Sequence, residues 1–429
     1  MSDRVTEDVA CTACACLCDD LKITSRDGRI VRAERACSLA EPWFLAQDSV
    51  ETPVATIRGQ SVTLDTAVSA AAGILKAARA PLIYGLSRSS TEGQRAAVEL
   101  ADLLGATIDT TASEGHAPSI LAMQQTGEST CTLGEIRNRA DLVIYWGADP
   151  VNSHPRHMER YAVDPPGLFV PRGRADRTLV VVDVKQTATA DRADLFLSIE
   201  AGRDFEALWT LRGLLRGIEP APETFTGLPL DHLKHLAERM KSCRCGVIFF
   251  GYGLVRQSLG HRNVEALLRL VTDLNQFTRF HARRLRVAGN VTGADSVLCW
   301  QTGFPFGVNL ARGYPRYNPG EYTAAELLAR HEVDAVVLVG TWRASAFPQK
   351  ALDYLRTVPA IVLDHAQAVP PIDPSVRFTT AIYGIHRPGT AYRMDEVPIP
   401  LRQVLDSPLP TDGEVLRAIH EAVSKRGHC

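Results

Sequence analysis

Four cysteines near the beginning of the sequence have the spacing of a metal-binding loop. They occur as Cys11-x2-Cys14-x3-Cys18, and Cys37 follows further along the chain. Four thiolates can hold a [4Fe–4S] cluster or close a tetrahedral zinc site. The short intervals let three ligands wrap one side of a metal centre, while the fourth comes from a more distant loop. We therefore predict a [4Fe–4S] or zinc site at Cys11, Cys14, Cys18 and Cys37.

The cysteine cluster also permits a different ligand set or no metal. Cys16 is an additional thiol inside the loop, and it is either a substitute ligand or a bystander. The four cysteines are alternatively remnants of an ancestral site that no longer holds a metal. Five of the ten cysteines fall within the first 37 positions. In a reducing compartment such clustering is more typical of metal ligands or redox groups than of disulfides.

The bulk composition excludes several classes of partner. The 429 residues carry 47 basic and 49 acidic side chains, a net charge of -2, so no excess of positive charge favours nucleic acid. No apolar run approaches the roughly 18–20 residues that span a bilayer. The first residues also lack the apolar core of a signal peptide. We therefore expect a cytoplasmic protein that binds neither nucleic acid nor membranes.

The elements around the cysteines predict a small N-terminal domain. Two short alternating runs, 21–24 and 30–33, flank Asp27-Gly28, which is typical of a β-hairpin. Cys37 follows this hairpin directly. We expect residues 1–54 to form a cysteine-motif domain in which the hairpin fixes the position of the fourth thiol.

After residue 55 the pattern changes to short apolar runs separated by helical segments. Continuous apolar runs of this kind are typical of parallel strands that are buried on both faces. Helical patterns such as 66–75 and 263–274 lie between them, which favours doubly wound α/β modules. The runs span residues 82–85, 142–147, 179–183, 247–251, 336–340 and 361–364.

These patterns predict three further parts of the chain. We expect a first α/β domain at 55–230, a second at 231–390, and an extended segment with a final helix at 391–429. The apolar runs near 85, 147, 251 and 340 end in glycine. Such a glycine either lets backbone approach a ligand at the sheet edge or satisfies turn geometry alone.

Longer motifs along most of the chain carry a family resemblance. In this order they closely resemble the B subunit of formylmethanofuran dehydrogenase, which carries a molybdenum or tungsten pterin, and the cysteine spacing resembles that of molybdopterin oxidoreductases. The resemblance runs from Cys11 to about Leu401. Its segments are 110–119, 127–135, 146–150, 154–157, 182–189, 290–293, 301–306, 312–320 and 389–395. It implies a molybdopterin-oxidoreductase-like α/β fold with a small cluster domain.

The chain departs from this family at one position. The family loop reads Cys-His-Gly-Pro-Ser, and its cysteine or selenocysteine binds the metal. The same register here reads Gly115-His116-Ala117-Pro118-Ser119. Glycine has no side chain and cannot coordinate, and metal sites tolerate little misplacement of a neighbouring ligand. We therefore expect no molybdenum or tungsten pterin centre.

Two residues match active-site positions of the family. In a dehydrogenase His116 would move protons and Arg286 would hold a carboxylate-like substrate. Without the metal we interpret both as remnants that line a polar cavity, and we expect no catalytic residue in this chain.

A family member without its metal ligand also resembles the B subunit of the bacterial formyltransferase/hydrolase complex. The resemblance implies a structural role in one-carbon metabolism that converts formaldehyde to formate through tetrahydromethanopterin and a methanofuran-type carrier. Its partners would be the A subunit, which resembles a zinc amidohydrolase, and the C and D subunits, of which D is the formyltransferase.

The alternative is the catalytic molybdenum or tungsten B subunit of a formylmethanofuran dehydrogenase. The intact four-cysteine motif favours this alternative, because an electron relay has no evident use in a hydrolase. Gly115 favours the structural role.

Overall fold

A computed structural model describes residues 3–48, 52–221, 226–256, 259–287, 289–340 and 344–425. The chain divides into two compact units. Unit 1 comprises residues 1–114 and 288–429, and unit 2 is the continuous segment 115–287. No helix among the described residues is long and apolar enough to cross a membrane.

Unit 1 contains a nine-stranded sheet whose five central strands are parallel. Its strand order is β14-β13-β7-β6-β15-β16-β17-β4-β5, with antiparallel strands at both edges. The central strands β6, β15 and β16 are buried along their whole length, as their apolar sequences predict. The strands are β4 (Ala55–Ile57), β5 (Gln60–Val62), β6 (Pro81–Gly85), β7 (Thr107–Thr110), β13 (Val308–Asn309), β14 (Arg316–Tyr317), β15 (Ala335–Val339), β16 (Ala360–Asp364) and β17 (Val376–Thr379).

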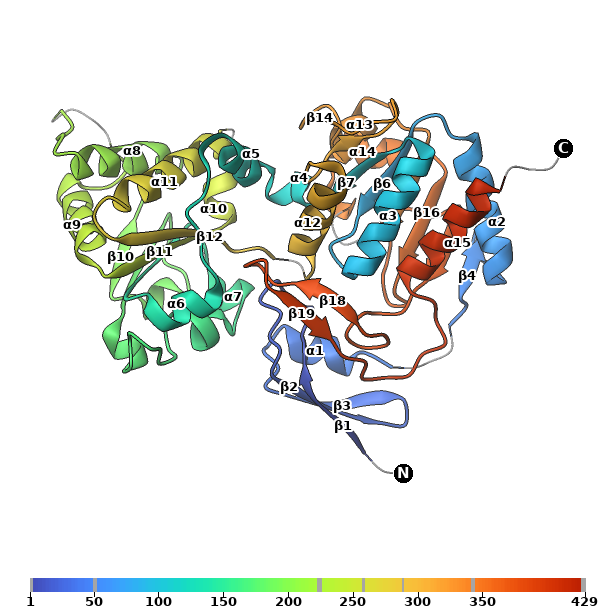
Figure 1. Cartoon of the computed structure of the whole chain (residues 1–429), viewed down its shortest axis with the longest axis horizontal. Helices are drawn as coiled ribbons and strands as arrows, with labels where there is room; N and C mark the ends of the chain where they lie inside the picture. The colour runs from blue at the N-terminus through green and yellow to red at the C-terminus, as the bar shows by residue number, and fades with distance from the viewer. Residues whose placement is uncertain are drawn as a thin grey trace. The chain divides into compact units, whose positions relative to one another are not determined.

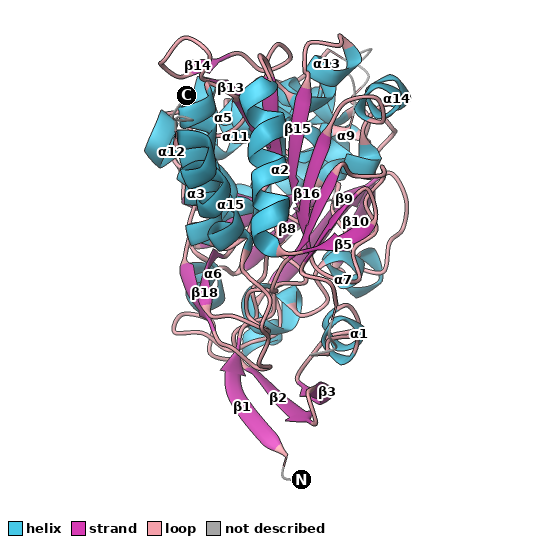
Figure 2. Cartoon of the chain, turned by 90° about the vertical axis from the view of Figure 1, so that its right-hand side faces the viewer, coloured by secondary structure: helices cyan, strands magenta, loops and turns pink. Residues whose placement is uncertain are grey.

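Helices cover both faces of this sheet. Alternate strand residues point to opposite faces, so Ile83 joins one apolar core while Leu82 and Tyr84 join another. The first core is covered by α2 (Leu64–Ala77), α3 (Thr91–Leu104), α12 (Val291–Thr302) and α15 (Asp412–Ser424). The second is covered by α13 (Ala324–Ala329) and α14 (Gln349–Leu355). Figure 2 shows α15 beside α2 and α3, as their contacts confirm.

A small antiparallel sheet holds the cysteine loop of unit 1. It consists of β1 (Arg4–Val9), β2 (Leu21–Arg26) and β3 (Arg29–Glu34), followed by α1 (Ala40–Leu45). The predicted hairpin is therefore present, and its turn at Asp27 and Gly28 has positive φ at both residues. A separate hairpin of β18 (Gly389–Tyr392) and β19 (Pro398–Leu401) belongs to the same unit.

Unit 2 contains a five-stranded parallel sheet of order β10-β9-β8-β11-β12. Its strands are β8 (Leu142–Trp146), β9 (Thr178–Asp183), β10 (Leu195–Ser198), β11 (Cys245–Phe250) and β12 (Arg279–Arg284). One face packs on α5 (Ala117–Thr126), α8 (Asp204–Leu215), α9 (Leu230–Ser242) and α11 (Gly260–Leu274) (Figure 1). The other face packs on the segment that contains His157 and Tyr161.

The six predicted strands occur, as do the helices predicted at 66–75, at 263–274 and at the C-terminus. The strands are grouped into sheets differently from the expected domain division. Strands at 81–85 and 107–110 share a sheet with those at 335–339 and 360–364. The strands at 142–198 pair instead with β11 and β12. Unit 2 is thus inserted as a block into unit 1, whereas the expected division placed 55–230 and 231–390 in consecutive domains. An apolar run reveals a buried strand but does not reveal which strand will pair with it.

Candidate metal and ligand sites

The cysteine loop is held in shape by its own backbone. Cys11, Cys14 and Cys18 lie between β1 and β2, and the Cys11 N–H donates to the Cys18 carbonyl at 2.8 Å. The Leu17 N–H donates to the Cys14 carbonyl at 3.2 Å, and Leu17 has a φ of 38° in the left-handed region. Cys37 arrives from the residues between β3 and α1. The small sheet therefore brings the fourth thiol to the loop.

The four predicted ligands lie close enough to influence one another. Cys11, Cys14 and Cys18 are buried and Cys37 is half-buried, and none of them is in a disulfide. Burial raises the pKa of the Cys11 thiol well above its ordinary value, and the nearby thiols of Cys14, Cys18 and Cys37 add to this effect. Four converging thiols would lose their protons readily only beside a compensating positive charge, which a metal centre provides.

The described part of the chain shows no group of three His, Cys, Asp or Glu side chains arranged to hold a metal ion. Whether this loop holds a cluster or zinc remains a prediction.

The loop at Gly115 does not offer a metal ligand. A Cβ atom added at Gly115 would collide with the hydroxyl of Tyr252, with the ring carbon Cζ 3.3 Å away. Tyr252 belongs to α10 (Tyr252–Val255), which follows β11. Tyr252 therefore occupies the space that a side chain at 115 needs. The residues present do not fit a protein-ligated molybdenum or tungsten here.

His116 lies directly beside this tyrosine. It is buried, and its ring centroid is 5.7 Å from that of Tyr252 at an interplanar angle of 30°. His116 precedes α5, and its carbonyl accepts hydrogen bonds from Ser119 at 2.9 Å and Ile120 at 3.0 Å. The Arg256 guanidinium lies 5.4 Å from the Tyr252 ring centroid. Both neighbours hold the tyrosine ring in place.

Arg286 lies in the segment after β12 and is almost completely buried. Its carbonyl oxygen is 2.7 Å from Nε2 of His154, and that nitrogen must carry the proton because a carbonyl only accepts. Nδ1 of the same ring lies 2.9 Å from the Ser153 hydroxyl. Burial lowers the pKa of His154 to about 4, so the ring is neutral at pH 7. His154 thereby positions the backbone of Arg286.

A second buried histidine accompanies the first. Nδ1 of His157 lies 3.0 Å from the Tyr145 hydroxyl, and burial lowers the pKa of His157 to about 3. The motif 154–157 supports the family resemblance, but its structural role could not be predicted. The one available signal was the pair of histidines three residues apart, which alone predicts neither partner.

Unit 1 contains a cavity of about 260 Å³ at the carboxyl edge of its sheet. The neighbouring strands β6 and β15 lie in the middle of the sheet. The chain passes from β6 outward to β7 on one side and from β15 outward to β16 on the other, so the direction of winding reverses between β6 and β15. Ligands of open α/β sheets bind at such a point. The lining includes Arg88 and Ser89 after β6, Gly340 after β15, Asp364 at the end of β16 and His365 directly after it.

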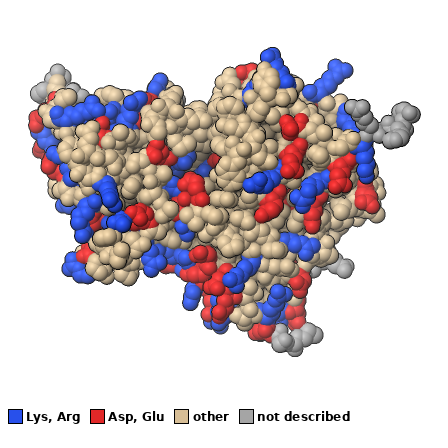
Figure 3. Space-filling view, viewed as in Figure 1, with Lys and Arg blue, Asp and Glu red and all other residues tan. Residues whose placement is uncertain are grey.

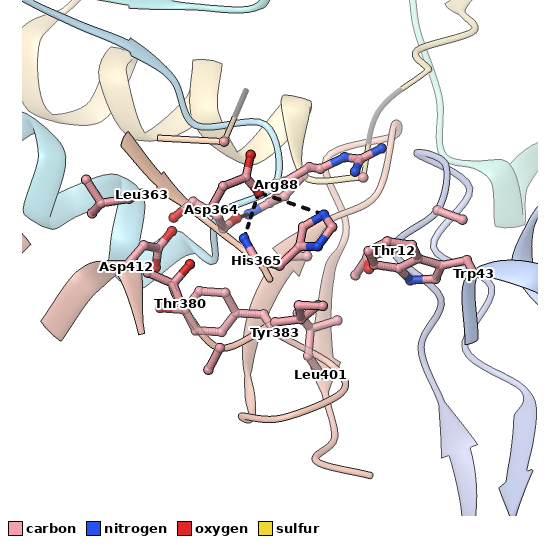
Figure 4. A pocket seen from close by; sticks show the side chains of 18 of the residues that line it. Thr12, Trp43, Arg88, Leu363, Asp364, His365, Thr380, Tyr383, Leu401 and Asp412 are labelled. Carbon is pink, nitrogen blue, oxygen red and sulfur yellow. Dashed lines mark hydrogen bonds and ion pairs between the residues drawn. The ribbon is translucent and has the colours of Figure 1, made fainter. Parts of the chain in front are cut away.

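Figure 4 shows the polar groups of this cavity. The Arg88 guanidinium lies 5.6 Å from the Trp43 ring centroid, and Asp412 and Tyr383 also line the cavity. Burial raises the pKa of the Asp412 carboxyl. A guanidinium, carboxylates, hydroxyls and an aromatic ring line the cavity, so it can hold a polar ligand through both donors and acceptors. The sequence pattern pointed to this cavity only through the glycine at 340.

The other strand-end glycines serve packing between backbones. A Cβ at Gly85 would collide with the carbonyl oxygen of Val339 on the neighbouring strand. In unit 2 the Gly253 N–H donates to the Gly147 carbonyl at 3.0 Å, and a Cβ at Gly147 would lie 2.9 Å from the Leu254 nitrogen. At these positions the glycine is required by close backbone approach.

Charged side chains are dispersed over the surface. On the face drawn in Figure 3, basic and acidic residues are interspersed, in keeping with the balanced composition.

The chain is similar along nearly its whole length to proteins of methanogens. It is 40% identical over 432 residues to the B subunit of tungsten-containing formylmethanofuran dehydrogenase 2 from Methanocaldococcus jannaschii, and the match covers 98% of this chain and 99% of that protein. It is 35% identical over 431 residues to the protein of the same name from Methanococcus maripaludis, covering 98% and 99%. A comparison with profiles of known protein families gives no match.

More distant similarity extends to a bacterial complex. The B subunit of the formyltransferase/hydrolase complex Fhc from Methylorubrum extorquens is 28% identical over 294 residues, covering 68% of this chain and 74% of that protein. The crystal structure of the FhcABCD complex with methylofuran has a chain at a TM-score of 0.70 and 25% identity, covering 86% of this chain and 98% of that one.

Acetylene hydratase from Pelobacter acetylenicus shares the fold, with a TM-score of 0.62 and 12% identity over 96% of this chain and 69% of that one. The predicted molybdopterin-oxidoreductase-like α/β fold is thereby confirmed.

Proposed function

Because the chain belongs to the family of formylmethanofuran dehydrogenase B subunits, we propose that it is the B subunit of a hetero-oligomeric one-carbon complex and has no metal-dependent redox step of its own. Its role in this proposal is architectural. The proposal keeps the family's fold and assembly while assigning the chemistry to other subunits.

The observation that carries this proposal is the contact between Gly115 and Tyr252. Glycine supplies no ligand, and the tyrosine hydroxyl fills the volume that a ligating side chain at 115 would enter. His116 and Arg256 both lie close to the same ring, and these contacts restrict its movement. A metal site that is both without a ligand and closed by packing supports a structural role.

The similarity to the FhcABCD structure supports the partners that the proposal needs. These are an A subunit resembling a zinc amidohydrolase, a C subunit, and a D subunit that is the formyltransferase. A methanofuran-type carrier would move the formyl group within the assembly. In this scheme the B subunit contributes binding surface and takes no part in hydrolysis or transfer.

We also propose that the loop of Cys11, Cys14, Cys18 and Cys37 holds a [4Fe–4S] cluster. The convergence of three buried thiols and the half-buried fourth supports this assignment. In the absence of a redox centre at Gly115, the cluster would cross-link the N-terminal module, residues 1–54, in which all four cysteines lie. Structural zinc in the same loop is the competing occupant.

A specific observation favours the alternative of a catalytic dehydrogenase. The chain is more similar to the tungsten-containing relatives, at 40% identity over 98% of its length, than to the Fhc relative, at 28% over 68%. The four-cysteine loop is also complete. On this alternative a molybdenum or tungsten pterin would be bound without a protein thiolate.

Metal analysis of the complex, purified with an affinity tag on this chain, distinguishes the architectural role from the catalytic dehydrogenase. We expect iron and sulfide near four per chain, no molybdenum or tungsten, and no formylmethanofuran dehydrogenase activity with a viologen acceptor. Molybdenum or tungsten in equal amount to this chain would disprove the architectural role. Zinc without iron in this chain, measured after its separation from the A subunit, would leave that role intact and remove the cluster.

A further inference from the structure

One face of helix α8 in unit 2 carries exposed aromatic side chains. Phe205 and Trp209 lie four residues apart, and their rings stack with the centroids 5.5 Å apart at an interplanar angle of 14°. Phe205 is nevertheless 38% exposed and Trp209 is 52% exposed. Because residues four apart lie on the same face of a helix, the next position in this row is Gly213.

Ile218 lies beside the position at which Gly213 offers no side chain. Gly217 has a φ of 74°, and the Ile218 N–H donates to the Gly213 carbonyl at 2.9 Å. This is a Schellman motif, which folds the chain back onto the last turn of a helix. A Cβ added at Gly213 would lie 3.9 Å from Cβ of Ile218, which is 62% exposed. Phe205, Trp209 and Ile218 therefore form one exposed row, which we call the α8 stripe.

Two arginines border the α8 stripe and share one carboxylate. The Arg212 guanidinium lies 4.5 Å from the Trp209 ring centroid, and its Nε pairs with Asp273 at 2.7 Å. Arg216 pairs with the same carboxylate at 2.8 Å. Asp273 belongs to α11, which lies beside α8 in Figure 1, in agreement with the contacts between the two helices. The Trp209 ring is thus restricted by its neighbours before any partner binds, which lowers the entropic cost of binding.

Helix α11 repeats this sharing of one acid by two arginines. Arg262 and Arg269 pair with Glu265 at 2.6 and 2.9 Å. On α8, α11 and the residues that cap them, five arginines thus pair with three carboxylates, a surplus of two positive charges, and no lysine contributes. The arginines are Arg203, Arg212, Arg216, Arg262 and Arg269, and the carboxylates are Glu206, Glu265 and Asp273. Asp204, the fourth acid, is buried and accepts a hydrogen bond from the Trp146 indole at 2.8 Å.

The composition of this surface is that of a protein–protein hot spot. Aromatic residues and arginine are enriched at the centres of such interfaces, whereas lysine is depleted. We propose that the α8 stripe is the docking surface for another subunit of the complex, which presents an apolar pocket bordered by aspartate and glutamate. This inference rests on the proposed function, because that function supplies the partner subunits, and it adds the surface at which one of them binds.

The charge surplus favours this occupant over two others. Carboxylates around the partner's pocket would complement the surplus of guanidinium groups. A second copy of this chain, docked through the same stripe, would bring like charges together, which is unfavourable. Nucleic acid needs a larger uncompensated positive field, whereas each of these guanidinium groups already pairs with a carboxylate and the whole chain carries a net charge of -2.

A photo-reactive residue tests which molecule contacts the stripe. p-Benzoylphenylalanine replaces Trp209 in the tagged chain, and the purified complex is irradiated and then digested for mass spectrometry. We expect a cross-link to a peptide of another subunit that contains aspartate or glutamate next to apolar residues. The same replacement at Trp300 in unit 1 is the matched control, because Trp300 is also 52% exposed and its ring centroid lies 5.7 Å from the Arg95 guanidinium. The control should not cross-link to that peptide.

Substitutions test the contributions of the ring and of the charge. We expect Trp209→Ala to raise the dissociation constant of this chain from the complex at least about tenfold, as removal of a hot-spot tryptophan does. Arg216→Gln should raise it less and make it less dependent on sodium chloride, whereas Arg216→Lys should keep the wild-type salt dependence. Trp300→Ala and Arg356→Gln, which removes an arginine paired with Asp353 in unit 1, should leave it unchanged. Mass photometry of the diluted complex at low and high salt gives the dissociation constants, and circular dichroism checks that each variant is folded.

Each contrary result has a distinct meaning. A dissociation constant that Trp209→Ala leaves unchanged in a folded chain would overturn the docking surface. A cross-link from position 209 to another copy of this chain, or to nucleic acid, would overturn the proposed occupant. Wild-type chain that purifies without other subunits would remove the proposed function as well, whereas a wild-type complex with an unchanged Trp209→Ala variant would remove only this inference.

Discussion

At the scale of single residues, Tyr252 limits the space available to a side chain at position 115. A Cβ placed at Gly115 would meet the Tyr252 hydroxyl. The backbone of Gly115 does not have a positive φ, so packing against Tyr252, and not backbone strain, is the obstacle to a side chain.

The effect of a substitution at Gly115 on the free energy of unfolding should therefore depend on the residue at position 252. Gly115→Ala inserts a methyl group against the tyrosine hydroxyl, and we expect it to reduce the free energy of unfolding by about 1–3 kcal/mol, the usual cost of overpacking. Tyr252→Phe removes the obstructing oxygen, so the double variant should recover much of that loss. Urea unfolding of the wild type, the two single variants and the double variant measures the coupling between the two positions. Additive effects would show that Tyr252 does not limit the site.

Restoring the family's ligand alone should not restore its chemistry. We expect Gly115→Cys to show no formylmethanofuran dehydrogenase activity and no bound molybdenum or tungsten, since the new thiol has no free volume. Expression in a molybdate- or tungstate-supplemented host, followed by metal analysis and a viologen assay, measures both. Metal in Gly115→Cys but not in Gly115→Ser would show that a pterin site persists.

The buried histidines predict a pH dependence of stability. Burial lowers the pKa of His154 to about 4 and that of His157 to about 3, below the value near 6.5 in the unfolded chain. Folded protein therefore binds fewer protons than unfolded protein between these values. Stability from these groups is complete above about pH 6.5 and is lost as the pH falls toward 4 and 3.

Replacing one histidine should make this dependence shallower. His154 contributes on the order of 3 kcal/mol to the loss by pH 4, at about 1.4 kcal/mol per pKa unit. His154→Gln cannot titrate, so urea unfolding between pH 7 and 4.5 should give a smaller slope than in wild type. The exposed His232→Gln in the same unit is the control. Equal slopes in all three proteins would contradict the assignment.

At the scale of elements, one buried carboxylate joins three segments of unit 1. Asp109 at the end of β7 accepts from Gly307 N–H at 2.9 Å, Ala324 N–H at 2.7 Å and the Ser113 hydroxyl at 2.7 Å. Burial nevertheless raises its pKa to about 7. The carboxylate thus connects β7 to α4 (Ala112–Gly115) and to the start of α13.

Asp109→Asn should therefore destabilise the chain. An amide offers only one oxygen, and its NH2 group would face the N–H of Ala324, leaving a buried donor unsatisfied. We expect a loss of about 1–3 kcal/mol in the free energy of unfolding at pH 8. Asp353→Asn, at an exposed position on α14, should change it little. A loss in Asp109→Asn no larger than this control would show that the three hydrogen bonds are not stabilising.

The helices and strands show which features of the fold could be predicted from the sequence alone. The apolar runs predicted β6, β8, β9, β11, β15 and β16 because burial on both faces leaves a continuous pattern. The four thiols of the predicted cysteine site lie within electrostatic range of one another, and their metal remains a prediction. Tyr252, His154 and the Asp364–Asp412 cavity could not be predicted, because each depends on contacts between segments far apart in the chain. Strand pairing is decided by the same kind of contact.

At the scale of the whole molecule, the insertion of unit 2 has a consequence for folding. Among the residues that the structure describes, its five strands pair with one another and not with strands of unit 1, and the buried residues of its apolar core lie between Ala122 and Ala282. In unit 1, by contrast, β6 pairs with β15 from beyond the insertion. Residues 1–114 by themselves thus lack the partner strands that complete their sheet.

The two segments should therefore behave differently as fragments. We expect residues 115–287 to unfold cooperatively in urea when expressed alone, since a closed set of strands and its covering helices bury one core. Residues 1–114 should aggregate or remain unfolded, because β6 and β7 would expose an unpaired edge. Circular dichroism and amide hydrogen exchange of both fragments measure this. A cooperatively folded 1–114 fragment, or an unfolded 115–287 fragment, would mean that stability depends on contacts outside the sheets, and the division into two units would then not describe how the chain folds.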